Sequence, residues 1–192
     1  ISTTGATGSV IVQARRTGGS YGCAASAWST ISTWTLGTTP TAPTLSSASP
    51  ANGSVVCAGF NTGTVTGTGG SGGSTGAANE YQVSIGGAYI PYTSGTAIST
   101  TGATGSVIVQ ARRTGGSYGC TASAWSTICT WTLGSTPTAP TLSSASPVNG
   151  SVVCAGFNTG TVTGLAGSGG STGAADEYQV SIGGAYIPYT SG

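Results

Sequence analysis

The chain has 192 residues, of which only four are Lys or Arg, three are Asp or Glu and none is His, and its formal net charge is +1. So few ionisable groups argue against an enzyme, and the near-neutral charge argues against a surface that binds nucleic acid. The sequence suggests no cofactor and no metal site. No run of residues approaches the roughly 18 apolar residues of a membrane span, so we expect no membrane insertion of this segment.

The chain consists of two copies of one unit. A shift of 97 residues aligns Ile1–Gly95 with Ile98–Gly192, and only seven of the aligned positions differ. Such near-identity indicates a recent duplication within a tandem array. Neighbouring repeats of the same array are therefore the partners that we expect, arranged head to tail.

The boundary between units does not coincide with the ends of the chain. The segments Gly37–Pro43 (GTTPTAP) and Gly134–Pro140 (GSTPTAP) each hold two prolines and no alternating pattern, which is typical of a linker. They predict three parts: residues 1–40 as the C-terminal part of a preceding repeat, 41–137 as one complete repeat, and 138–192 as the N-terminal part of a following repeat.

Short alternating runs, separated by glycine-rich turns, predict the strands of the complete repeat. They are Thr44–Ser47, Ser54–Ala58, Thr62–Thr66, Glu80–Ile85, Tyr89–Thr93, Ala97–Thr100, Ser106–Thr114 and Ala124–Leu133. The glycine run Gly67–Gly76 is expected to be a flexible loop. Seven or eight short strands in one repeat favour an all-β fold, with immunoglobulin-like or fibronectin-like β-sandwich repeats in tandem. A β-solenoid is the alternative, but no shorter repeat is visible inside the unit.

The last predicted hairpin carries most of the distinctive side chains. Strict alternation would place Trp125, Cys129 and Trp131 on one core-facing side of the final strand. Two tryptophans with this spacing are typical of a core, but Trp125 and Trp131 with Tyr89 and Tyr92 would alternatively form a platform on which a sugar stacks. The same alternation sends Arg112 and Arg113 to opposite faces of the sheet, which argues against one anion-binding patch.

The five cysteines leave two pairings open. Cys57 and Cys120 both occur within the complete repeat, and a bridge between them would close a long loop and stabilise the fold by roughly 4 kcal/mol. The competing pairs are Cys23 with Cys57 and Cys120 with Cys154, which would join neighbouring domains. Of the two, the bridge within the domain is favoured. Cys129 has Ser32 at the equivalent position and is expected to be a free thiol in the core.

Three motifs, VVCAGFNTGTVTG, YTSGTAISTTGATGSVIVQARRTGGSYGC and SAWSTICTWTL, resemble the tandem repeats of very large Bacteroidetes cell-surface adhesins of the SprB gliding-motility kind. The resemblance covers the whole chain. It implies an extracellular filament on the cell surface, exported by type IX secretion, that attaches to a surface and takes part in gliding motility. The alternative function is a carbohydrate-binding β-sandwich module, whose partners would be surface glycans.

The two incomplete parts lead to a prediction of their own. Each has unpaired strand edges and only part of a core. We expect each part to be ordered only when the rest of its domain is supplied, either by the continuing chain or by a neighbouring chain that completes the sandwich head to tail.

Overall fold

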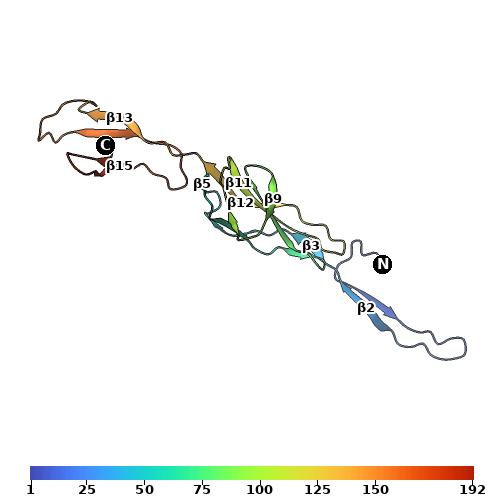
Figure 1. Cartoon of the computed structure of the whole chain (residues 1–192). Coiled ribbons are helices and arrows are strands. Elements are labelled where there is room, and N and C mark those ends of the chain that lie inside the picture. The colour runs from blue at the N-terminus through green and yellow to red at the C-terminus, as the bar shows by residue number, and fades with distance from the viewer.

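The computed structural model describes all 192 residues as an elongated molecule built from strands, with no helix (Figure 1). A central body lies between a hairpin at the N-terminal end and strand pairs at the C-terminal end. The all-β prediction is confirmed. The strands are β1 (Ser9–Ala14), β2 (Ser29–Thr35), β3 (Thr38–Thr41), β4 (Leu45–Ser49), β5 (Val55–Cys57), β6 (Gly63–Gly67), β7 (Ser71–Gly73), β8 (Asn79–Ile85), β9 (Tyr89–Tyr92), β10 (Ala97–Ile98), β11 (Ser106–Arg113), β12 (Ser126–Gly134), β13 (Thr141–Ser146), β14 (Thr161–Leu165), β15 (Tyr178–Val180) and β16 (Ile187–Tyr189).

The central body contains two sheets that share one core. One sheet has the order β5-β12-β11-β8-β9, and the other has the order β10-β6-β4. Neighbours run antiparallel, except that β5 runs parallel to the end of β12. Both sheets contribute to the buried cluster, so they pack face to face. The cluster is Val56, Val65, Val83, Ile98, Val107, Val109, Ala111, Ile128, Cys129 and Trp131.

The predicted strands of the complete repeat all form, and their ends differ from the prediction by at most two residues. The alternation in β11 is also as expected, since Val107, Val109 and Ala111 are buried while their neighbours are partly exposed. Period-2 burial is a local property that the sequence displays directly.

A β-bulge breaks the alternation that the sequence predicts for β12. The register between β11 and β12 shifts after Val109, and the two consecutive residues Ile128 and Cys129 are both buried. A bulge inserts one extra residue, so the side chains before it change face relative to those after it. Trp125 therefore lies on the outer face, and the prediction that it shares the core-facing side with Trp131 is wrong.

The linker and the glycine run are more ordered than predicted. β3 lies in the first linker and pairs with β7 in the glycine run, and the hydroxyl oxygens of Thr41 and Ser71 lie 2.7 Å apart. The second linker repeats this contact, where Thr138 and Ser168 form a bridge with the same hydroxyl distance of 2.7 Å. Each linker is thus docked on the repeat that follows it.

Trp131 occupies the centre of the core. Its side chain is fully buried, and its indole Nε1 donates a hydrogen bond to the Pro50 carbonyl at 3.0 Å. A Cβ at Gly63 would lie 2.8 Å from the indole ring, so only glycine leaves enough room there. The ring and this glycine come from opposite sheets, which fixes how closely the two sheets approach.

Candidate functional site

The two arginines of the central body make separate sets of contacts on opposite faces of the sheet. On the outer face, Arg112 Nε and Glu80 Oε2 form an ion pair at 2.6 Å, and the Arg112 guanidinium lies 4.6 Å from the centre of the Trp125 ring. Arg113 turns to the other side and donates hydrogen bonds to the Gly72 carbonyl at 2.8 Å and to Asn79 Oδ1 at 3.1 Å. The two arginines therefore form no common anion site.

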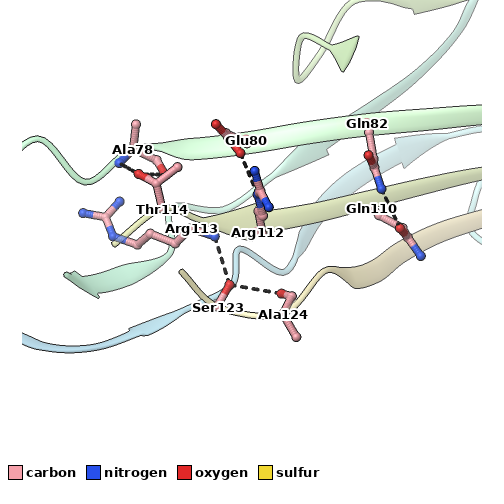
Figure 2. A network of polar contacts seen from close by, with 9 residues as sticks. All are labelled: Ala78, Glu80, Gln82, Gln110, Arg112, Arg113, Thr114, Ser123 and Ala124. Carbon is pink, nitrogen blue, oxygen red and sulfur yellow. Dashed lines mark hydrogen bonds and ion pairs between the residues drawn. The ribbon is translucent and has the colours of Figure 1, made fainter. Parts of the chain in front are cut away.

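The rest of this outer face is a ladder of amides and hydroxyls (Figure 2). Gln82 Nε2 donates to Gln110 Oε1 at 2.9 Å, as Figure 2 shows. Gln110 Nε2 donates in turn to Thr127 Oγ1 at 3.3 Å. These groups bond to one another and include no nucleophile with an adjacent base. No three His, Cys, Asp or Glu side chains gather in an arrangement that could hold a metal ion.

The four aromatic residues of the hypothetical sugar platform do not come together. Trp131 is fully buried, Trp125 lies on the outer face, and Tyr89 is exposed on an edge strand. The Tyr92 hydroxyl lies 2.9 Å from the carbonyl oxygens of Val65 and Thr96, to which its one proton can be donated, and it accepts from the Val65 amide at 3.1 Å, so it serves the packing of the sandwich. The structure corrects the platform hypothesis, because the bulge and the core position of Trp131 separate the rings.

The favoured disulfide between Cys57 and Cys120 is also wrong, since all five cysteines are free thiols. Cys57 is paired with Gly134 at the end of β12, whereas Cys120 lies in the loop that precedes β12. A strand rises about 3.3 Å per residue, which places the two ends of β12 roughly 25 Å apart. The Cα atoms of a disulfide lie within about 7 Å, so these two cysteines cannot pair within one domain.

Cys129 is a buried free thiol, as the sequence predicts. Burial removes solvent from the thiolate and raises the pKa of Cys129 to about 11. A thiol with such a pKa is mostly protonated at neutral pH and is a poor nucleophile.

The most distinctive surfaces lie on residues 1–40 and 138–192, outside the central body. Their residues repeat the core residues of the central body but are exposed: Trp34 is 50% exposed where Trp131 is 0%, and Val162 is 47% exposed where Val65 is 0%. Large apolar surfaces of this kind mark sites of association. The hairpin β1–β2 matches β11–β12 except that Ser32 stands in place of Cys129. The strands β13 to β16 correspond to β4, β6 and parts of β8 and β9, with Leu165 in place of Thr68.

An open apolar hollow of about 700 Å³ lies in the C-terminal part. Its lining includes Leu142, Val162, Tyr178, Val180 and Tyr189. The equivalent residues in the central body belong to the core or pack against it. The sequence signal for this surface is the 97-residue repeat itself, because it pairs each of these exposed residues with a buried or partly buried equivalent in the central body.

The junction between repeats is the second distinctive surface. Val55 of the central body accepts a hydrogen bond from the Thr172 amide at 2.9 Å, and the Val55 amide donates to Thr172 Oγ1 at 2.8 Å. Gly37 and Gly134 occupy the same place at the two junctions, and a Cβ on either would overlap a carbonyl oxygen, that of Gly73 or that of Gly170. Only glycine permits this close approach of the linker to the following repeat.

No family model, no curated protein and no solved structure matches this chain. The chain also contains no helix with the length and apolar character needed to cross a membrane.

Proposed function

We propose that this chain is a section of an extracellular filament, in which sandwich repeats stack head to tail as the stalk of a cell-surface adhesin. One observation carries the proposal: each incomplete part exposes the residues that its counterpart buries in the central body, and the missing partner is present in the same sequence. An array of identical units satisfies every such surface except at its two ends.

The finer fold that we propose is immunoglobulin-like or fibronectin-like. Three strands, β4, β6 and β10, form one sheet, and β8, β11 and β12 form the centre of the other. This division corresponds to strands A, B and E facing strands C, F and G. The first strand of the sandwich is divided between the two sheets. Its first half, β4, pairs with β6, and its second half, β5, runs parallel to β12 in the other sheet.

The occupant of the exposed C-terminal surface is the β1–β2 hairpin of a second copy of this repeat. Its Trp34 would take the place that Trp131 has in the central body. Gly160 is the equivalent of Gly63, so the same space for an indole ring is present in the C-terminal part. Two residues therefore make the surfaces complementary, the bulky Trp34 on the hairpin and Gly160 opposite it.

Such a filament would extend away from the cell and attach it to a surface. Its polar surface is rich in hydroxyl groups and nearly free of charge, which suits a passive stalk better than a catalyst. Attachment to a surface, gliding motility and type IX secretion enter the proposal through the resemblance to the adhesin repeats of the SprB kind. A carbohydrate-binding module is not favoured, because the four aromatic rings do not form one platform.

Sedimentation of the purified chain as a function of concentration tests this proposal under reducing conditions. We expect chains to associate head to tail, so that the sedimentation coefficient rises with concentration. Val162→Asp should abolish the rise, because it puts a charge into the surface that must receive the hairpin. The control is Val148→Asp, since Val148 is exposed and its equivalent, Ala51, is exposed in the central body too.

Electron microscopy of the assembly gives a second readout. A strand of eight or nine residues spans roughly 26 to 30 Å, and the loops at both ends lengthen the domain to roughly 30 to 45 Å, so the fibre should show an axial period of that size per repeat. Closed rings, or a chain that stays monomeric at every concentration, would contradict the proposal.

A further inference from the structure

Each junction glycine has a cysteine beside it, and the two junctions show different cysteines. At the first junction, the Cys120 sulfur lies 3.3 Å from the position that a Cβ on Gly37 would take. At the second junction, Cys57 is the register partner of Gly134 in the parallel pair of β5 and β12. Gly37 and Gly134 are equivalent residues 97 positions apart.

The two sulfurs lie on the same side of the junction. Register partners on neighbouring strands point their side chains to the same face, at a spacing of about 5 Å. The Cys57 side chain therefore points to the face on which a Cβ of Gly134 would lie. The Cys120 sulfur is found on that face of Gly37. In a junction with both neighbours present, the two cysteine side chains would lie on the same face of one glycine, on neighbouring segments, which is the arrangement that a disulfide needs.

A separate set of contacts places the second cysteine at the same point. In the central body, the loop that holds Cys120 is seated on Ser74 and Thr75, through bonds from the Tyr118 amide to Ser74 Oγ at 3.0 Å and from the Ser117 amide to the Thr75 carbonyl at 2.9 Å.

The equivalents of this seat are Ser171 and Thr172, and these two residues line an open cavity together with Cys57. The loop of a completed following repeat would thus bring its cysteine into the cavity that Cys57 already lines.

We propose that every junction of the array is closed by a disulfide between the Cys57-type cysteine of one repeat and the Cys120-type cysteine of the next. In head-to-tail copies of this chain, the pairs are Cys57 with Cys23 of the next copy, and Cys154 with Cys120 of the next copy. This inference rests on the proposed head-to-tail stacking. The residue numbers are those of the competing cysteine pairs, Cys23 with Cys57 and Cys120 with Cys154, but here each bond joins two different chains. In one continuous array the bonded cysteines would be 160 residues apart, which is the 63 residues from Cys57 to Cys120 plus one repeat of 97.

The chemistry is thiol–disulfide exchange. A small-molecule or protein disulfide accepts two electrons and is reduced to two thiols, while the two cysteine thiols lose their protons and form one sulfur–sulfur bond. The product is a joint with two covalent connections, the linker and the disulfide. Such a joint resists bending and stretching more than the linker and two hydrogen bonds alone.

The test uses the 192-residue chain with glutathione and its disulfide as the redox couple. A mixture of unlabelled and ¹⁵N-labelled chains is oxidised at a concentration at which they associate, then separated on a non-reducing gel and mapped by mass spectrometry. We expect a ladder of covalent oligomers and hybrid peptides that join Cys23 to Cys57 and Cys120 to Cys154. Cys57→Ser should remove the first link and keep the second, and the Cys57→Ser, Cys154→Ser pair should abolish the ladder.

Cys129→Ser is the matched control and should leave the ladder unchanged, because that thiol is buried. A bond between Cys57 and Cys120 of one chain, or association without either expected link, would overturn the inference while head-to-tail stacking stands. If the chains do not associate, the same oxidation is carried out on two copies fused in tandem. The link between them is Thr-Ala, which stands between Gly95 and Ile98 in the sequence and keeps the 97-residue spacing. The absence of a bond from Cys57 of the first copy to Cys23 of the second would then reject it.

Discussion

Replacing Trp131 by Phe is the sharpest test of how the central sandwich is held together. The indole loses its hydrogen bond to the Pro50 carbonyl, which contributes about 1 kcal/mol net. The smaller ring also leaves a cavity opposite Gly63, at a further cost of about 1 to 2 kcal/mol. We expect the free energy of unfolding to fall by about 2 to 3 kcal/mol, a large share of the roughly 5 to 15 kcal/mol that stabilises a domain.

Urea denaturation followed by far-UV circular dichroism measures this change, at a concentration where sedimentation shows monomers. The matched control is Trp34→Phe, the same substitution at the equivalent position, where the side chain is half exposed. There the loss should stay below about 0.5 kcal/mol. Equal losses at both positions, or no loss at Trp131, would refute the assignment of the core.

Three further predictions concern single side chains. Arg112→Ala should cost less than about 1 kcal/mol, and less still in high salt, because its ion pair with Glu80 is exposed to solvent; a larger, salt-independent loss in urea melts would contradict this. Tyr92→Phe should lower the stability of the central body by about 1 to 3 kcal/mol, because the hydroxyl that bonds the Val65 and Thr96 carbonyls is lost. Tyr189→Phe should leave the thermal transition of the central body unmoved, because its hydroxyl bonds Val162, which lies outside that body. Because burial raises the pKa of Cys129 from 9.0 to about 11, the unfolded chain loses this proton at a lower pH than the folded chain. The resulting contribution to the free energy of unfolding is complete below pH 9 and is lost as the pH rises through about 11. Cys129→Ser should flatten this part of the stability profile.

The 97-residue repeat and most strands of the central body could be predicted from the sequence. Alternation along Ser106–Arg113 and the intervening glycine-rich turns are local patterns, and local patterns decide where a strand forms and which of its faces is apolar. Comparison of the two copies also pairs exposed residues such as Trp34 and Val162 with the buried equivalents Trp131 and Val65 in the central body.

Only the tertiary structure decided the features that depend on contacts between distant segments. The bulge at Ile128 arises from the pairing of β12 with β11, and it moves Trp125 to the outer face without any mark in the alternating pattern. The pairing of β3 with β7 joins two stretches that show no strand pattern separately.

The same reason explains the cysteines. Cys57 and Cys120 lie 63 residues apart in the sequence, and a loop of that length allows them to meet or to lie far apart. Sheet order places Cys57 beside the end of β12, and chain direction places Cys120 before its beginning. Because β12 is extended, the two thiols lie near its opposite ends, each at a different junction.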